Sequence, residues 1–129
     1  MGEHASTNMA IIEGALGKDP EFKEVDGRKI AKLLVATQEM WRERGELHSR
    51  TDWHTVHVSN ARQVEAIEKS VRRGSRIRIE GLMKTLAHQS AEGQEWVRST
   101  VISLERGRGR LRLLDAPIEK AGGRKDEAR

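Results

Sequence analysis

The sequence predicts an all-β protein, a five-stranded barrel with one α-helix between its third and fourth strands. Its apolar residues come in short clusters separated by polar runs, which is typical of a small β protein rather than a helical bundle. Between residues 60 and 74 the apolar spacing changes to three and four, the spacing of one helix face. Strand-like segments return after residue 74. The length of 129 residues fits one domain.

Two strands are expected in the first part of the chain. Residues 9–16 form the first strand, and the turn-rich segment 17–20 ends it. Asp26 and Gly27 are a tight-turn signal. Residues 30–37 then form a longer strand with apolar side chains on both faces.

A charged loop and a third strand follow. The loop is expected over residues 42–51, with Gly45 at its centre. Residues 53–58 alternate between polar and apolar side chains, as a half-buried strand does. Trp53 therefore lies on the polar face of this strand, together with Thr55, His57 and Ser59.

One helix is well specified between residues 60 and 74. Asn60 can cap its first turn, and Gln63 stands three residues later, as in a capping box. Arg72 and Arg73 are expected in the last turn, where the helix dipole favours cations, and Gly74 can take the left-handed stop conformation. Its apolar face consists of Ala61, Val64, Ile67 and Val71.

Two more strands complete the expected barrel. Residues 76–81 alternate cleanly, so that Ile77 and Ile79 point inward. Residues 82–93 are expected to be a flexible hairpin loop, and residues 96–105 the returning strand. Three strands, a capped helix and two strands are the order of an OB-fold barrel.

The domain boundaries follow from composition. A flexible N-terminus is expected over residues 1–7, the barrel over 8–114, and a disordered tail over 115–129. The tail has almost no apolar residues and carries equal numbers of acidic and basic side chains.

Composition excludes several classes of protein. No segment approaches the roughly 18 apolar residues that a membrane span needs, so no membrane partner is expected. The N-terminus lacks the apolar core of a secretory signal. The absence of cysteine excludes disulfides, thiolate nucleophiles and Cys-ligated metals, and suits a reducing cytoplasm. The net charge of +4 hints at an anionic partner.

Nothing in the sequence supports a metal site, a cofactor or an enzyme. His54 and His57 are an odd number of residues apart in a strand, so they face opposite sides and cannot chelate together. Asp52 and His88 do not complete a ligand set with either of them, and no catalytic Ser–His–Asp or paired-carboxylate arrangement emerges.

Four segments, in order and at matching spacing, resemble the bacterial and mitochondrial single-stranded DNA-binding proteins. They are residues 8–21 (NMAIIEGALGKDPE), 34–42 (LVATQEMWR), 51–54 (TDWH) and 74–81 (GSRIRIEG). The resemblance covers roughly residues 8 to 114. It implies an OB-fold that binds single-stranded DNA without sequence preference in replication, recombination or repair. It also implies a homo-oligomer, a tetramer rather than a dimer, in a cytoplasm of bacterial, phage or plasmid origin.

The resemblance also implies site residues. Trp41 and Trp53 match the two stacking tryptophans of the family, and His88 and Trp96 lie near positions of further family aromatics. The cations expected beside the DNA are Lys23, Arg42, Arg44, Arg62, Arg73 and Lys84. The residues expected at the subunit interface are Asn8, Ile11, Glu13 and His54.

A run of alternating arginines has two interpretations that the sequence leaves open. Arg106, Arg108, Arg110 and Arg112 are expected on one face of an extended segment. The first three are candidates for extra phosphate contacts. Alternatively, the row is a solvated edge strand that its charges protect from aggregation.

The chain departs from the family pattern at several positions. Ser59 and His88 stand where accessory aromatics are typical, Glu13 stands at a usually apolar position, and the C-terminus lacks the acidic tip that recruits partners. We therefore expect fewer stacking contacts, a larger electrostatic share of the affinity, and no recruitment through the tip. The alternative function is an OB-fold primosomal or protein-interaction module with modest nucleic-acid affinity. A third possible function is that of a structural OB domain with no nucleic-acid role.

Overall fold

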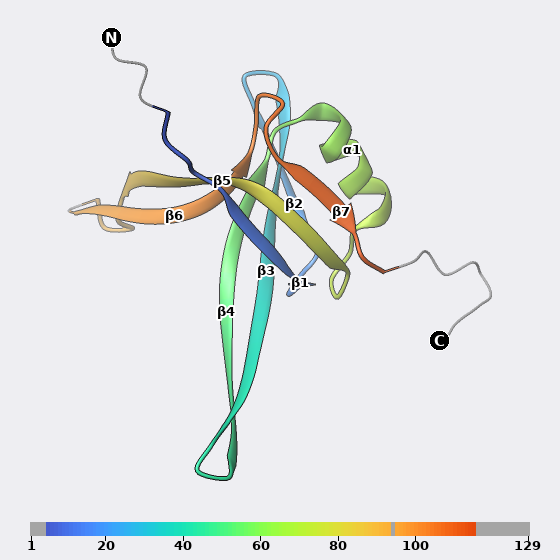
Figure 1. The fold of residues 1–129 in the computed structure, drawn as a ribbon. Coiled ribbons are helices and arrows are strands. Elements are labelled where there is room, and N and C mark those ends of the chain that lie inside the picture. Colours follow the sequence, from blue (N-terminus) through green and yellow to red (C-terminus); the bar gives the residue numbers. More distant parts are fainter. Residues whose placement is uncertain (1–4, 94, 116–129) are drawn as a thin grey trace.

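The computed structural model describes residues 5–93 and 95–115. The expectations for the two chain ends, residues 1–7 and 115–129, fall mostly outside these residues. No described helix is long and apolar enough to cross a membrane. In chain order the elements are β1 (Ala10–Leu16), β2 (Glu21–Val25), β3 (Arg28–Glu43), β4 (Glu46–Val58), α1 (Ala61–Ser70), β5 (Arg76–Gln89), β6 (Trp96–Leu104) and β7 (Arg110–Leu113) (Figure 1).

Five of these strands close into a barrel, which confirms the predicted fold. The order around it is β1, β3, β4, β6 and β5, and β5 pairs back with β1 to complete the ring. The first part of β5 pairs with β1 and its second part with β6, so one long strand serves two neighbours. The β4–β6 pairing is parallel and the other pairings of the ring are antiparallel. The helix α1 lies between the third and fourth barrel strands in the chain, as expected.

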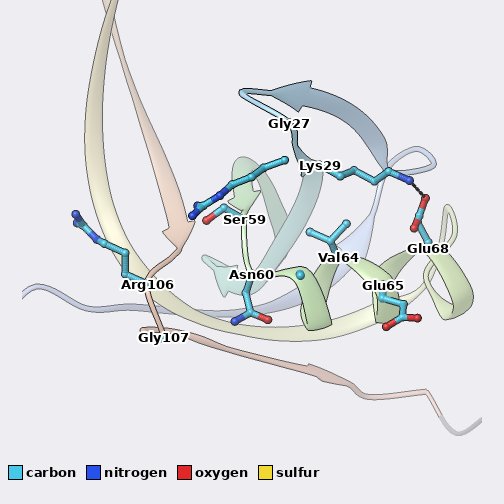
Figure 2. A pocket seen from close by; sticks show the side chains of 11 residues that line it. Gly27, Lys29, Ser59, Asn60, Val64, Glu65, Glu68, Arg106 and Gly107 are labelled. Atoms are coloured by element: carbon cyan, nitrogen blue, oxygen red, sulfur yellow. Dashed lines mark hydrogen bonds and ion pairs between the residues drawn. The ribbon is translucent and has the colours of Figure 1, made fainter.

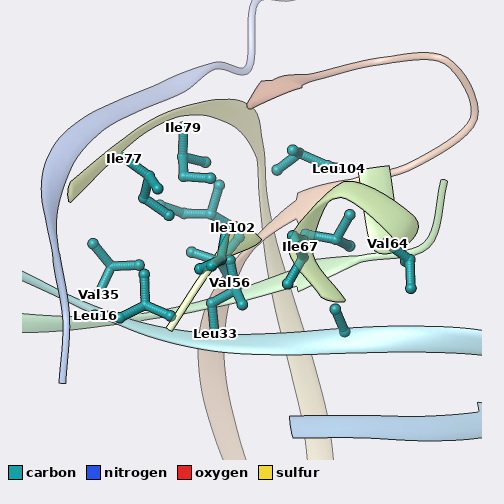
Figure 3. Packing of buried hydrophobic residues seen from close by; sticks show 13 residues of the cluster. Leu16, Leu33, Val35, Val56, Val64, Ile67, Ile77, Ile79, Ile102 and Leu104 are labelled. Carbon is teal, nitrogen blue, oxygen red and sulfur yellow. The ribbon is translucent and has the colours of Figure 1, made fainter. Parts of the chain in front are cut away.

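All five barrel strands and the helix contribute buried side chains to the core. Side chains at alternate positions are buried, as the two-residue period of a strand requires, and Ile77 and Ile79 are fully buried as predicted. Figure 3 shows Val64 and Ile67 of α1 beside Leu104 and the other core side chains. Burial of an aliphatic side chain of this size stabilises the fold by about 1.5–3 kcal/mol. The helix thus belongs to the same core as the strands.

The helix begins as predicted and ends earlier. The Asn60 side chain accepts a hydrogen bond from the Gln63 backbone N–H at 3.1 Å, which confirms the cap. The helix ends at Ser70, because Val71 is extended and buries its side chain in the core. Arg72 and Arg73 therefore lie beyond the last turn, and their predicted place in the helix is wrong. Arg72 still reaches back, because its guanidinium donates to the carbonyls of Glu68 and Val71 at 2.9 and 2.8 Å.

Gly74 does not end the helix, contrary to prediction. It is left-handed, with φ of 89°, but it lies in the connection that follows Val71. Its backbone N–H donates to the Leu16 carbonyl at 2.9 Å, and so ties this connection to the end of β1. The glycine therefore serves the turn into β5 rather than the helix end.

The charged loop expected over residues 42–51 is wrong. These residues form the outer half of a hairpin whose register runs unbroken from Ala31 opposite Val58 to Glu43 opposite Glu46. The turn is Arg44-Gly45, and both residues are left-handed, with φ of 52° and 81°, as a tight hairpin turn with the favoured twist requires.

The flexible loop expected over residues 82–93 is also wrong. Strand β5 continues to Gln89 and pairs with β6 up to Trp96. The two long hairpins, β3–β4 and β5–β6, leave the barrel in different directions, toward the bottom and the left of Figure 1. A strand that was not predicted, β2, pairs with β3 through the Asp26-Gly27 turn, and that turn is confirmed.

Candidate nucleic-acid interface

The outer face of β4 carries a row of polar and aromatic side chains. Val56 and Val58 of this strand are fully buried, so the alternate residues Trp53, Thr55 and His57 point outward. This confirms the polar face predicted for Trp53. The indole is 56% exposed, which is unusual for so large an apolar side chain and leaves it accessible to a planar ligand.

Trp53 stands between two hollows of the surface. One of about 430 Å³ lies toward β1 and β3 and is lined by Gly14, Gln38 and Arg76 among others. The other, of about 350 Å³, lies toward β5 and β6, with Met83 and Thr100 in its lining. Both volumes lie within the range of small-molecule sites. A base can therefore approach this indole from either side.

Trp41 lies on the other face of the β3–β4 hairpin. It pairs with His48, and the two rings stack with centroids 5.7 Å apart and planes 19° apart. Trp53 pairs with Ala36, which is five residues before Trp41 on β3, and an odd separation reverses the face. The structure therefore does not bring the two predicted stacking residues onto one surface.

The predicted arginines come from three separate places. Arg42 and Arg44 lie at the tip of the β3–β4 hairpin, where Arg42 shares the face of Trp53 and Arg44 is in the turn. Arg62 is exposed in the first turn of α1, and Arg73 lies in the connection between α1 and β5. These four cations do not form one cluster.

Lys23 and Lys84 share the outer face of β4 with two residues that the sequence analysis did not assign to DNA. Lys32 pairs directly with His57, and Lys23 pairs with Ile30, two residues from Lys32. We call the set Lys23, Lys32, His57 and Lys84 the His57 patch. The signal that could have found it is the two-residue alternation continued from Trp53 to His57, with a lysine on the facing strand.

The charges around His57 change its acidity. Burial lowers the pKa of the His57 imidazole below its usual 6.5, and the positive charges of Lys32, Lys23 and Lys84 lower it further. Lys84 is held by Glu105, whose carboxylate oxygens lie 3.1 and 3.3 Å from its Nζ. A hydrogen bond from the Ser103 hydroxyl and the charge of Lys84 hold the pKa of Glu105 below its usual value. The patch is therefore cationic, with one carboxylate at its border.

The other two aromatic candidates lie far along the β5–β6 hairpin. His88 is exposed and shares the face of Lys84. Trp96, 70% exposed, pairs with Gln89 and therefore lies on the opposite face from His88. This hairpin, like β3–β4, thus presents a tryptophan on the face away from the lysines.

The predicted single row of arginines is wrong. Arg106 and Gly107 are left-handed, at φ of 53° and 72°, and form a tight turn between β6 and β7. The chain turns there because Glu105 and Arg108 bridge across it. Arg106 donates to the Glu105 carboxylate at 2.7 Å, and Arg110 and Arg112 are on β7 at the edge of β5. The row is split between a turn and a short edge strand.

The four candidates for a subunit interface lie on or near β1 and β4. Asn8 extends β1 by bonding the Met83 backbone with both ends of its amide at 2.9 Å. Ile11 is 49% exposed, and Glu13 accepts a hydrogen bond from Arg78 at 2.8 Å. His54 points to the other side of β4 from His57, and its Nε2 lies 2.8 Å from the Thr37 hydroxyl.

A third hollow, of about 750 Å³, lies away from the tryptophans, between the β2–β3 turn, the start of α1 and the β6–β7 turn (Figure 2). Three of its polar side chains have partners within the chain. Lys29 donates to Glu68 at 2.7 Å, Ser59 to the Leu104 carbonyl at 3.3 Å, and Asn60 caps the helix. We therefore do not place the nucleic-acid site there. Within residues 5–93 and 95–115, no cluster of three His, Asp or Glu side chains could hold a metal ion.

Known proteins share the sequence pattern and the fold of this chain. The sequence model of the single-strand binding protein family matches residues 7–107. The single-stranded DNA-binding protein of Rhizobium meliloti (strain 1021) is 38% identical over 121 residues, which are 92% of this chain and 69% of the relative. The protein of that name from Rickettsia felis (strain ATCC VR-1525 / URRWXCal2) is 36% identical over 114 residues, 86% of this chain and 74% of the relative. A solved structure described as Plasmodium falciparum SSB complex with ssDNA superimposes with a TM-score of 0.81 at 32% identity, covering 88% of this chain and 100% of the other. The chain belongs to the single-strand binding protein family.

Proposed function

We propose that the protein binds single-stranded DNA without sequence preference, in DNA replication, recombination or repair. The observation that carries this proposal is the exposed Trp53 between two hollows, on the same strand face as a group of cations. The family and the relatives that share the fold support it. The protein acts by binding, without catalysis or a cofactor.

Two kinds of contact supply the affinity. Bases stack on Trp53 and Trp41, and each stacked base contributes on the order of 1–3 kcal/mol whatever its identity, because every base has a π face. Lysines and arginines contact phosphates and release counterions, so the affinity falls as salt rises. Because this chain has few aromatics and many cations, electrostatic contacts supply a larger share of its affinity for DNA than the family pattern implies.

A fluorescence titration tests this function. The chain has three tryptophans and no tyrosine, so emission reports on the tryptophans alone. We expect oligo-dT to quench the emission at low salt and high salt to reverse most of the quenching, while duplex DNA has a much weaker effect. Trp53→Ala is expected to weaken binding by about 5- to 150-fold, the equivalent of about 1–3 kcal/mol.

A second exposed aromatic provides the matched control. Phe22 on β2 is 38% exposed but pairs with Ala31, whose side chain is buried, so it does not share the face of Trp53. Phe22→Ala is expected to leave the dissociation constant unchanged within about twofold. Absence of quenching at low salt, together with nuclease-resistant capture of a protein partner, would instead support the interaction module.

We infer further that the chain works as a homo-oligomer, a tetramer rather than a dimer, in the cytoplasm. Met9 and Ile11 are 60% and 49% exposed beside an edge of β1. Over residues 10–14 the described ladder of β1 is with β5 alone, so the other edge can pair with a second copy. Light scattering measures the assembly, and Ile11→Arg is expected to reduce its mass.

A further inference from the structure

The His57 patch is a candidate for a binding role that stacking does not explain. It gathers three lysines and one histidine from four strands onto one outer face, beside the row that begins with Trp53. We propose that Lys32 and His57 form a subsite for one backbone phosphate of the bound strand, with the charges of Lys23 and Lys84 on either side of it, and that His57 takes up a proton from solvent when the phosphate binds. This inference rests on the proposed function. It adds a specific phosphate subsite and the uptake of one proton on DNA binding.

The register of the sheet brings these groups together. Lys32 lies directly opposite His57 on β3, and Lys23 lies one strand further, on β2. On the other side, His57 lies opposite Ser103 of β6. Lys84 of β5 is opposite Val101, two residues before Ser103, and therefore points to the same face. Cations thus approach the imidazole from both sides of β4.

The His57 ring itself lacks a partner. It is half-buried, and within the described residues it makes no hydrogen bond through either nitrogen. His54 and His88, in contrast, each lie within hydrogen-bond distance of an oxygen. A half-buried polar group without a partner carries a desolvation cost that a ligand can relieve. Once protonated, the ring can donate a charge-assisted hydrogen bond to a phosphate oxygen.

The charged groups around His57 favour an anion as the ligand. On β2 and β3 they are Lys23, Lys32 and Glu21, and Glu21 is paired with Lys18 at 2.7 Å. From β5 and the end of β6 come Lys84 and Glu105, with Arg106 also bound to Glu105. Two lysines of the patch, Lys23 and Lys32, have no ion-pair partner within the described residues. A phosphate can therefore be bound there without breaking an ion pair of either lysine.

A phosphate also changes the acidity of His57. In the free protein, burial and the three lysines hold its pKa below 6.5, so the ring is mostly neutral near pH 7. The negative charge of a phosphate favours the charged imidazolium and raises that pKa. DNA binding and protonation are therefore linked, and each favours the other.

The experiment measures the affinity of the full chain for oligo-dT between pH 5.5 and 8 at constant salt. For the wild type we expect the affinity to increase as pH falls, by up to about 10-fold per pH unit between the pKa of His57 in the complex and in the free protein. His57→Gln is expected to remove this slope, because a glutamine side chain cannot take up a proton when the strand binds.

Two lysine variants provide a matched comparison. Lys32→Gln is expected to weaken binding and to reduce the slope of log affinity against log salt by about 0.7, the value for one phosphate contact on a single strand. Lys69→Gln removes an exposed cation on α1 and is expected to leave both the salt slope and the pH slope unchanged. Equal effects of the two variants would contradict the subsite.

A second readout does not depend on a variant that folds. In NMR titrations of the wild type, the His57 ring signal is expected to titrate below pH 6.5 in free protein and at higher pH with oligo-dT. Inorganic phosphate at the same ionic strength is expected to give a much smaller change. An equal change would indicate a general anion site, and an unchanged pKa in the DNA complex would overturn the proposal. If the wild type fails to bind oligo-dT at every pH, the proposed function itself is wrong.

Discussion

The position of Trp53 depends on a residue without a side chain. A Cβ atom added to Gly17 would lie 2.4 Å from Cζ3 and 2.9 Å from Cη2 of the Trp53 ring, closer than real Cβ atoms approach. The indole therefore packs directly against the backbone that follows β1. Gly17 acts as a positioning residue, because it lets the ring lie over the end of this strand.

Gly17→Ala is expected to displace the Trp53 ring and to weaken oligo-dT binding, by at most the loss caused by Trp53→Ala. The two substitutions should not be additive, because both act through one ring. A double-mutant cycle by fluorescence titration measures the coupling. Additive losses would mean that Gly17 acts on the fold rather than on the indole.

His57 also links the stability of the free protein to pH. Its pKa is lowered in the folded state, so the unfolded chain binds more protons between the folded-state pKa and 6.5. The contribution of His57 to stability is thus complete above pH 6.5 and is lost as pH falls through the folded-state pKa. Urea unfolding at pH 5.5 and 7.5 should show a smaller pH difference for His57→Gln than for the wild type. The same pH difference in both proteins would contradict this assignment.

At the scale of elements, the parts that share the core were predictable and the long hairpins were not. Ile77, Ile79 and the capped helix were identified because burial imposes a period on the sequence. Residues 38–47 are exposed on both faces, so they carry no such period. Their backbones still pair as two strands, but the charged sequence gives no sign of that pairing.

The helix α1 is anchored by a few buried side chains. Ile67→Ala is expected to destabilise the protein by about 2–5 kcal/mol, because this side chain is fully buried against the barrel core. Glu65→Ala, on the exposed side of the same helix, should change stability by no more than about 0.5 kcal/mol. Urea unfolding compares the two. Equal losses would show that helix propensity, rather than packing, is being measured.

The site was predictable only in part, for a similar reason. The family resemblance singled out Trp53, its alternation with two valines predicted an outward face, and the structure confirms that face. The opposite orientation of Trp41 follows from the register of the two strands, which cannot be known while residues 42–51 are taken for a loop. The His57 patch required the neighbours of β4 on both sides, and those are set by the barrel topology.

At the scale of the whole molecule, the distribution of cations determines which of them respond to salt. Arg106 shares the Glu105 carboxylate with Lys84, whereas Arg108 and Arg110 line a hollow beside Asn8 and Met9, at the start of β1. Replacing Arg106, Arg108 and Arg110 together by Gln should therefore leave the salt slope of oligo-dT binding unchanged. A reduction of about 2, which is 0.7 for each of the substituted arginines, would show that all of them contact phosphates.

The opposite faces of Trp41 and Trp53 have a consequence for the shape of the bound DNA. A strand that stacks on both must pass around an edge of the β3–β4 hairpin, so it bends rather than lying straight. Binding then shortens the distance between the ends of the strand, which energy transfer between terminal dyes can measure. Mechanical tension on the DNA opposes that shortening and should release the strand from one tryptophan before the other.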